Sequence, residues 1–176
     1  YIPTGSMEET LQVGDHLFVE KITYGPIIPK MLGMKAPIHI KALSLRDIKR
    51  GDIVIFTPPI EKEKHKDYIK RCIALPGDEF HIKDGYVYIN NEKLNEPYTL
   101  GKITDYRDFP LTKNNNIEGI VPEGKVIVLG DNRTNSSDSR YFGYLDITAI
   151  KGKAFILYWN TEQILQGDFT RLGFIK

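Results

Sequence analysis

The feature that most constrains the fold of this chain is a series of short apolar runs rich in β-branched and aromatic residues. Glycine, proline or asparagine bounds each run, and no long helical pattern occurs. Such runs favour β-strands, and the bounding residues favour turns. The runs cover residues 16–20, 52–56, 85–89, 125–129 and 153–159. The sequence therefore predicts a mostly β protein.

The length of 176 residues suits one hydrophobic core with a small appended lobe. Residues 80–120 differ in texture from the rest, with Asn90-Asn91 as an expected hairpin turn and Asn114–Asn116 as a second loop. We therefore expect one β core formed by residues 1–79 and 121–176, which would hold any catalytic site, and a small β insertion at 80–120.

Residues 24–46 contain Pro26, Pro29 and Pro37 and are expected to form a long surface loop. Near its end, Leu43–Ile48 predicts one short helix, with Ser44 as the N-cap.

Charge and cysteine content exclude several classes of function. Lysine and arginine number 24 against 23 aspartates and glutamates, so the chain has no basic excess that would attract nucleic acid. Cys72 is the only cysteine, which excludes an intrachain disulfide. The four histidines show no metal-ligand spacing, and we expect no metal and no cofactor. No run approaches the ~20 apolar residues that a membrane-spanning helix needs.

Ser6 follows Thr4 and Gly5, and Pro3 fixes one backbone dihedral just before them. A tight turn of small residues can expose a hydroxyl and direct backbone N–H groups at the same point, as the stabilisation of an oxyanion requires. Gly-Ser dipeptides are also common in ordinary loops. The local pattern therefore leaves Ser6 as either a nucleophile or a loop residue.

Lys70 lies in a strand-like stretch where alternation places Tyr68 and Cys72 on the same face. A lysine among such neighbours is poorly solvated, and burial lowers its pKa toward the range in which it can act as a base. The alternative is a lysine that extends to solvent at a strand edge. Arg71, on the opposite face, is expected to be solvated or paired.

Residues 130–140 form a third cluster, which is almost wholly polar and follows the apolar run 125–129. A loop dense in hydroxyl groups and opposed charges can orient a catalytic group through hydrogen bonds. It can equally be a solvated turn.

Taken in order, these clusters resemble the bacterial type I signal peptidases, which are membrane-bound Ser-Lys endopeptidases that remove signal peptides from exported proteins. The matching blocks span most of the chain. They are Ile2–Met7 with Thr10, Leu11, Gly14 and Asp15; Arg50–Phe56; Tyr68–Arg71 with Pro76–Asp78; and residues 130–133 with Ser136, Asp138–Arg140 and Gly143. The resemblance implies antiparallel sheets of the signal-peptidase type. Glu9 and Ala74 depart from the family pattern, which commonly has proline and glycine there.

The resemblance also implies roles for the matching residues. Ser6 would be the nucleophile and Lys70 the general base, with the backbone N–H of Ser6 and the hydroxyl of Thr4 as the oxyanion hole. Supporting roles would fall to Ser136 as a hydrogen-bond partner of Lys70, to an Asp138–Arg140 ion pair, and to Asp131 and Arg133, which would hold the loop.

Small side chains at substrate positions −1 and −3 would enter shallow pockets, with cleavage after an Ala-x-Ala type of site. By the resemblance, these pockets would be lined by Ile2, Pro3, Met7, Leu11, Leu17, Ile55, Tyr68 and Ile69. The substrates would be the signal peptides of exported preproteins.

The same resemblance implies a location at the inner (cytoplasmic) membrane, with the catalytic part on the extracytoplasmic, periplasmic side. An N-terminal transmembrane anchor would precede Tyr1 and be absent from this chain. Contact with the lipid surface is expected at Met7, at the loop around Ile27 to Met34 and at neighbouring apolar residues.

Two other functions fit parts of the sequence. One is a related Ser-Lys peptidase that processes conjugative pilin. The other is a non-catalytic β module that binds peptides at an exposed sheet edge.

Overall fold

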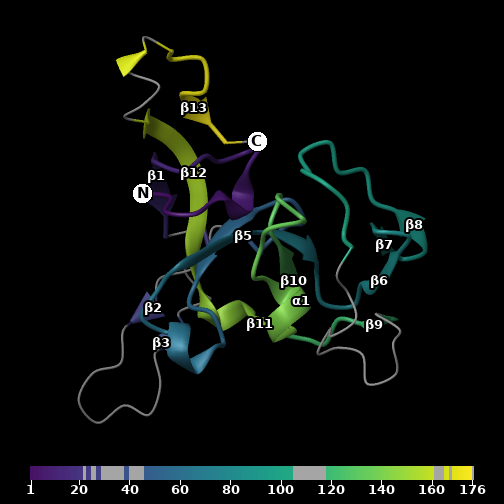
Figure 1. Ribbon diagram of the computed structural model, residues 1–176. Coiled ribbons are helices and arrows are strands. Elements are labelled where there is room, and N and C mark those ends of the chain that lie inside the picture. The colour runs from purple at the N-terminus through teal and green to yellow at the C-terminus, as the bar shows by residue number, and fades with distance from the viewer. Residues whose placement is uncertain are drawn as a thin grey trace.

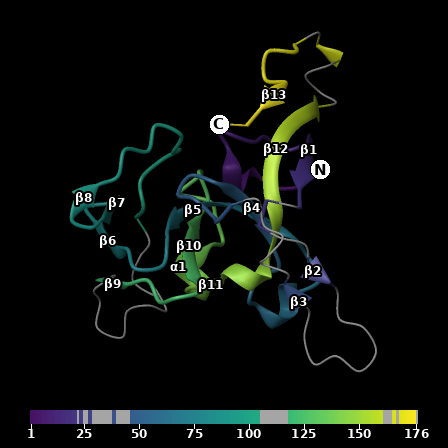
Figure 2. The same cartoon turned by 180° about the vertical axis from the view of Figure 1, so that it is seen from behind.

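A computed structural model describes residues 1–21, 23–24, 27–28, 38–39, 46–104, 118–160, 165–166 and 168–175. These residues form a seven-stranded sheet, a four-stranded sheet and a two-stranded ladder, with little helix. Figures 1 and 2 show the larger sheet in the middle, with the four-stranded sheet and the ladder on opposite sides of it. The predicted mostly β, antiparallel fold is confirmed.

The seven-stranded sheet has the order β1-β12-β4-β5-β10-β11, and β13 pairs with β12. All of these pairings are antiparallel. Four of the predicted strand segments correspond to β1, β4, β10 and β12. The strands are β1 (Asp15–Glu20), β4 (Ile53–Phe56), β5 (Tyr68–Ala74), β10 (Lys125–Leu129), β11 (Leu145–Asp146), β12 (Ile150–Asn160) and β13 (Gly173–Phe174).

The four-stranded sheet has the order β8-β7-β6-β9, also antiparallel. Its strands are β6 (Glu79–Lys83), β7 (Tyr86–Ile89), β8 (Glu92–Lys93) and β9 (Glu118–Ile120). The predicted hairpin turn at Asn90-Asn91 is confirmed, because both residues have positive φ (52° and 66°) and join β7 to β8. Two-residue hairpins of this kind need positive φ at both positions, which asparagine tolerates.

The region expected to be one long surface loop contains a short ladder of β2 (Ile27–Ile28) and β3 (Ile38–His39). That expectation was therefore wrong at these residues, because β-branched isoleucines favour extended, paired backbone. The first half of the helix expected at Leu43–Ile48, and the loop expected at Asn114–Asn116, lie outside the described residues. Arg46–Ile48, which are described, are not helical.

Four short helical turns lie within the described residues, and Leu165 is helical as well. The four turns are η1 (Gly5–Met7), η3 (Glu61–Glu63), α1 (Ser139–Phe142) and η4 (Ile147–Ala149). No helix among the described residues is long and apolar enough to cross a membrane.

β5 lies at the centre of the larger sheet and is buried along nearly its whole length. Three hydrophobic clusters meet it: Ile73 contributes to one, Cys72 to a second and Ile69 to a third. The first cluster also contains Phe80 and Val87, so the four-stranded sheet packs on β5 and β10 through a shared core. A strand that is packed on both faces and paired at both edges holds its polar side chains in fixed positions. Lys70 lies in β5, so its side chain is held in this way.

Candidate active site

Ser6 lies in the turn η1, and backbone hydrogen bonds fix the chain on both sides of it. The N–H of Ile2 donates to the carbonyl of Asp15 at 2.8 Å, and the N–H of Gly14 donates to the carbonyl of Ile2 at 2.9 Å. The N–H of Leu11 donates to the carbonyl of Met7 at 2.7 Å. These bonds place the turn over the core and leave Ser6 only 7% exposed.

Lys70 of β5 directs its amine at Ser6. Its Nζ lies 2.7 Å from Ser6 Oγ and 2.8 Å from the carbonyl of Ile69, and the residue is 4% exposed. The amine also lies 5.3 Å from the centre of the Tyr68 ring. The structure thus brings the predicted nucleophile and the predicted base into hydrogen-bond contact.

Burial lowers the pKa of Lys70 from its ordinary value of 10.5 to about 8, because desolvation disfavours the charged amine. The negative charges of Asp138 and Asp131 oppose this shift, and the positive charge of Arg140 adds to it. With a pKa near 8, roughly one lysine in ten is neutral at pH 7. A neutral amine at this distance can accept the proton of the serine hydroxyl.

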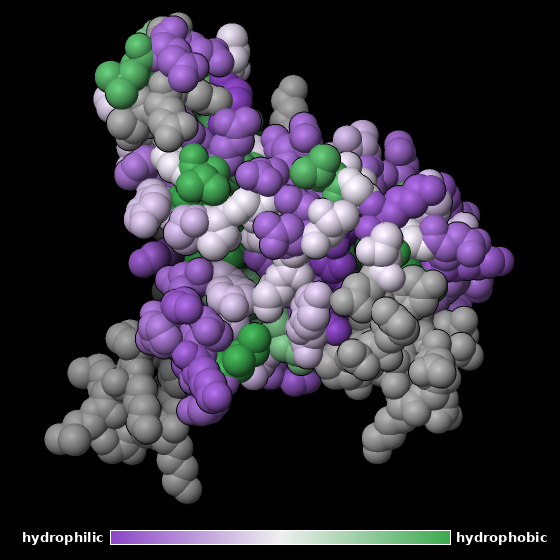
Figure 3. Space-filling view, viewed as in Figure 1, coloured by the Kyte–Doolittle hydropathy of each residue, from purple (hydrophilic) through white to green (hydrophobic). Residues whose placement is uncertain are grey.

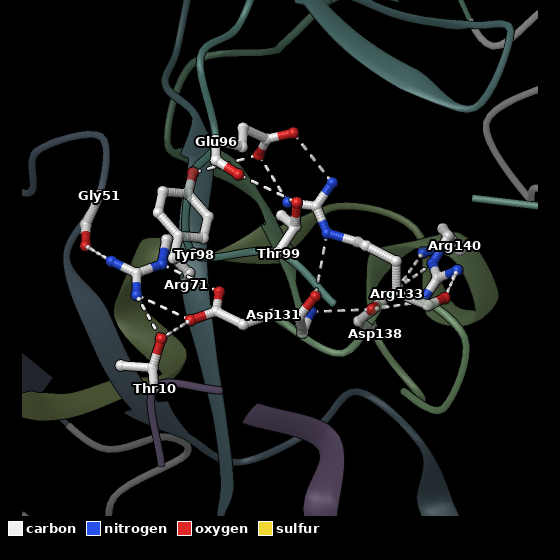
Figure 4. A network of polar contacts seen from close by, with 11 residues as sticks. Thr10, Gly51, Arg71, Glu96, Tyr98, Thr99, Asp131, Arg133, Asp138 and Arg140 are labelled. Atoms are coloured by element: carbon white, nitrogen blue, oxygen red, sulfur yellow. Dashed lines mark hydrogen bonds and ion pairs between the residues drawn. The ribbon is translucent and has the colours of Figure 1, made fainter. Parts of the chain in front are cut away.

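Three buried arginines lie near the dyad, and a carboxylate neutralises each of them (Figure 4). The pairs are Arg71–Asp131 at 2.7 Å, Arg133–Glu96 at 2.5 Å and Arg140–Asp138 at 2.9 Å. No such ion pair joins Lys70 to a carboxylate of the described residues, and its hydrogen bonds go to neutral oxygens. The desolvation of its charge is therefore compensated less than that of its neighbours.

The residues predicted to support the loop bind one another or elements outside the loop. Asp138 and Arg140 pair with each other, and Asp138 also accepts the N–H of Gly130 at 2.9 Å. Asp131 pairs with Arg71 of β5, whereas Arg133 pairs with a glutamate that follows β8. Arg71, which the sequence left as solvated or paired, is paired and buried.

Ser136 does not make the hydrogen bond that was expected with Lys70. Its hydroxyl is buried and has no hydrogen-bond partner among the described residues. The amine of Lys70 instead donates to Ser6 Oγ and to the Ile69 carbonyl, which lies next to it in β5.

Thr4 is exposed and has extended backbone just before the nucleophile turn. Its hydroxyl does not cap η1. Thr4 lines the same cavity as Ser6 and Lys70.

A cavity of about 550 Å³ opens at Ser6 and Lys70, and a second of about 140 Å³ adjoins it. Tyr1 and Asp67, neither of which was predicted, border both cavities. The predicted pocket residues that line one or both are Ile2, Pro3, Leu17, Ile55, Tyr68 and Ile69. Met7 and Leu11 line neither, contrary to expectation, because both are fully buried in the cluster beneath.

Several residues at the site were not found by sequence reasoning. Thr10 donates to Asp131 and accepts from Arg71, and the ring of Tyr98 lies under the Arg71 guanidinium at 3.9 Å. Glu96 is the partner of Arg133. Thr10 belongs to a matching block and could have been assigned from it. Glu96 and Tyr98 carry no local signal, because a glutamate and a tyrosine in a turn-rich segment are ordinary surface residues.

Comparison with known proteins agrees with this geometry. A family model described as signal peptidase, peptidase S26, matches residues 1–159. A probable signal peptidase I-2 of Synechocystis sp. is 37% identical over 167 residues, which are 93% of this chain and 64% of that protein. A signal peptidase I of Bacillus caldolyticus is 35% identical over 169 residues, which are 93% of this chain and 80% of that protein.

A crystal structure of a signal peptidase I from Enterococcus faecalis V583 is 32% identical and covers 62% of this chain and 98% of that chain, with a TM-score of 0.47. The family model spans well over half of the chain and contains both Ser6 and Lys70. This chain belongs to the signal peptidase family, peptidase S26.

Proposed function

We propose that this chain is the catalytic part of a membrane-associated serine endopeptidase that cleaves signal peptides from exported preproteins. The observation that carries the proposal is the 2.7 Å contact between Ser6 Oγ and the buried amine of Lys70. The two relatives above are named signal peptidases, which supports this substrate class over conjugative pilin. The dyad favours catalysis over peptide binding alone.

In the proposed reaction, neutral Lys70 accepts the proton of the Ser6 hydroxyl as Ser6 Oγ attacks the scissile carbonyl. The tetrahedral intermediate then expels the amine of the mature protein, which takes a proton from the Lys70 ammonium, and an acyl-enzyme ester remains on Ser6. Lys70, neutral again, deprotonates a water molecule that hydrolyses the ester. One base thus serves both steps.

The oxyanion of each intermediate would be stabilised by the backbone N–H of Ser6 and the hydroxyl of Thr4. Support comes from the place of Thr4 at the cavity and from a hydroxyl that is not used as a helix cap. Ser136 would hydrogen-bond Lys70 during the reaction, since its buried hydroxyl lacks a partner among the described residues and such a group gains by acquiring one.

Specificity for small residues would come from the cavity of about 140 Å³, which is walled by Ile2, Leu17 and Ile55. Its apolar walls penalise a charged side chain. The larger cavity at the dyad would hold the scissile bond and the residue beside it.

The division of the chain into a catalytic core (1–79 and 121–176) and an inserted lobe (80–120) is also part of the proposal. In its support, the four-stranded sheet draws its described strands from residues 79–93 and 118–120, and Ser6, Lys70 and the polar loop lie outside it.

We further propose that the protein acts at the extracytoplasmic face of the cytoplasmic membrane and that it touches the lipid surface. Met7 does not contribute, since it is fully buried, and the side chains between Ile27 and Met34 lie outside the described ones. The face drawn in Figure 3 is largely hydrophilic, with hydrophobic residues in small separate patches.

An aromatic surface on β1, β12 and β13 is the better candidate for lipid contact. Its rings touch in sequence from Tyr1 through His16 and Tyr158 to Phe18, with centroids 4.4 to 6.1 Å apart. A second pair of rings, Phe155 and Phe174, lies on the neighbouring strands at 5.2 Å. Because Tyr1 also borders the cavities at the dyad, this surface would bring the cleft to the bilayer.

The test is cleavage of a purified preprotein with an Ala-x-Ala site by this chain, with the product N-terminus read by mass spectrometry. We expect one cut after the small residue, and no cut with Ser6→Ala or Lys70→Met. Glu92→Gln, an exchange at an exposed position of β8 in the other sheet, serves as the control. Cleavage at near wild-type rate by Lys70→Met would show that the dyad is misassigned.

A further inference from the structure

The segment Glu96–Leu100, here called the clamp segment, follows β8 and lies against the polar loop of residues 130–140 (Figure 4). The N–H of Leu100 donates to the carbonyl of Asp131 at 2.9 Å, and the N–H of Arg133 donates to the carbonyl of Leu100 at 2.9 Å. Within the segment, the hydroxyl of Thr99 donates to the carbonyl of Glu96 at 3.0 Å. The clamp segment is therefore a short rigid piece of chain paired to the loop beside the dyad.

Glu96 binds the loop through a bidentate ion pair with Arg133. Its carboxylate is 7% exposed and accepts from Nη1 of Arg133 at 3.0 Å and from Nη2 at 2.5 Å. The third guanidinium nitrogen, Nε of Arg133, donates to the carbonyl of Gly130 at 3.0 Å. Bidentate pairs fix orientation as well as distance, so Glu96 sets where Arg133 holds Gly130.

Tyr98 acts on a second element, β5. Its ring lies 3.9 Å from the guanidinium carbon of Arg71, the residue next to Lys70 in the chain. Its hydroxyl donates to Oε1 of Glu96 at 3.1 Å, which links the two side chains of the clamp segment. The half-buried ring thus covers the Arg71–Asp131 pair on the side of the clamp segment.

The loop in turn is in direct contact with the backbone of the nucleophile. The N–H of Asn132 donates to the carbonyl of Ser6 at 3.1 Å. Gly130 approaches so closely that a Cβ placed on it would lie 2.5 Å from the same carbonyl oxygen. A shift of the loop by a fraction of an ångström must therefore shift Ser6.

We propose that Glu96 and Tyr98 are positioning residues for the Ser6–Lys70 dyad, which hold the polar loop and Arg71 where Ser6 Oγ stays within reach of Lys70 Nζ. This inference rests on the proposed peptidase function. Neither side chain lines the cavities at the dyad, so their loss acts on the reaction step rather than on substrate binding.

The experiment compares kcat and KM for cleavage of an Ala-x-Ala signal peptide by the whole chain and by single variants. Glu96→Gln keeps the size of the side chain but removes its charge, and should lower kcat at least about tenfold with KM changed less than about twofold. Glu96→Asp keeps the negative charge on a shorter side chain, so its kcat should fall less than that of Glu96→Gln. Tyr98→Leu should lower kcat more than Tyr98→Phe, which keeps the ring over Arg71.

The matched control is Glu92→Gln, the same exchange at an exposed position of β8 in the same lobe, which should leave both constants unchanged. Rates are normalised to folded protein by near-UV circular dichroism. A folded Glu96→Gln with kcat within about twofold of the control, or one that raises KM alone, would overturn the inference. If Glu96→Gln does not fold, Tyr98→Leu, which removes the ring over Arg71, decides by the same criterion. Failure of the wild-type chain to cleave would instead overturn the proposed function.

Discussion

At the scale of single residues, the site depends on how buried positive charges are compensated. Arg71 and Arg140 each have a carboxylate partner, whereas Lys70 has only neutral oxygen acceptors among the described residues. The arginines hold the loop through these ion pairs, whereas burial lowers the pKa of Lys70 toward the range in which its amine is neutral. The chemistry of the dyad thus depends on the absence of a close counter-ion.

Replacing Lys70 with methionine should stabilise the fold near pH 7. A folded-state pKa near 8 against 10.5 in the unfolded chain means that keeping the amine protonated in the fold costs about 3 kcal/mol. Below pH 8 both states bind the proton and the full cost remains. Between pH 8 and 10.5 the unfolded state binds more protons, so the stability of the wild type rises with pH.

Urea unfolding of both proteins near neutral pH and at about pH 10 measures this difference. The free energy of unfolding of Lys70→Met should exceed that of the wild type by up to about 3 kcal/mol at pH 7 and by only about 1 kcal/mol at pH 10. A variant that is less stable than the wild type at pH 7, or a difference independent of pH, would contradict the burial of a titrating lysine.

The sequence predicted which residues form the dyad, but it did not predict which residues the buried arginines contact. Ser6 and Lys70 lie in motifs with local signatures, and strand alternation indicated a poorly solvated lysine. The partners of Arg71 and Arg133 lie 60 and 37 positions away, and only the packed fold brings them together. Met7 and Leu11 were assigned to the pockets by the resemblance, but apolar residues that follow the nucleophile also suit the core below it.

At the scale of elements, the close fit between η1 and the polar loop decides the geometry of the site. Gly130 lies at the contact between them, where a Cβ would stand 2.2 Å from Ser136 Oγ and 2.5 Å from the carbonyl of Ser6. Because one of these contacts is backbone, the two elements would have to separate to admit a methyl group.

Gly130→Ala should therefore destabilise the protein by roughly 1–3 kcal/mol and slow cleavage more strongly than this loss of stability explains. Thermal unfolding and single-turnover cleavage measure the two effects. The matched control is Gly119→Ala in β9, whose Cβ would meet the hydroxyl of Tyr144 at an ordinary 3.6 Å. Equal behaviour of the two variants would show that the contact at Gly130 is not critical.

Element prediction succeeded where a pattern is local and failed where pairing is distant. The apolar runs predicted β1, β4, β7, β10 and β12 to within a few residues, and asparagines marked the turn between β7 and β8. The ladder of β2 and β3 was missed because prolines around it suggested a loop. The clamp segment was also missed. Its two backbone hydrogen bonds join Leu100 to a loop some thirty residues away, and such bonds produce no periodic pattern in the sequence.

At the scale of the whole molecule, the dyad and the aromatic surface share one end of the larger sheet through Tyr1, which borders the cavities and touches His16. The lipid contact expected from the sequence fell on Met7, which is buried, and on residues 27–34, whose side chains lie outside the described ones; the aromatic surface is our proposed alternative. The aromatic surface is assembled from β1, β12 and β13, so its residues are widely separated in the chain and form no run.

Exchange of Phe18 and Phe174 for serine should weaken binding to phosphatidylglycerol-containing vesicles, on the order of tenfold for each side chain that enters the lipid. Both are largely exposed, so stability should change little. Vesicle co-sedimentation measures the effect, and cleavage of a short soluble peptide should be unaltered. Ile120→Ser on β9, an equally exposed apolar residue of the other sheet, is the control. An equal loss of vesicle binding by the control would contradict the proposal that the aromatic surface contacts lipid.

The measurement that tests the Ser6–Lys70 dyad most directly is a site-resolved titration of Lys70 by NMR, with labelled lysine and with Lys70→Met to assign the signal. We expect a titration midpoint at about pH 8 in the folded chain, and the acid limb of the kcat/KM profile should follow the same midpoint. An active protein whose Lys70 titrates near the ordinary value of 10.5 would contradict the assignment of Lys70 as the base.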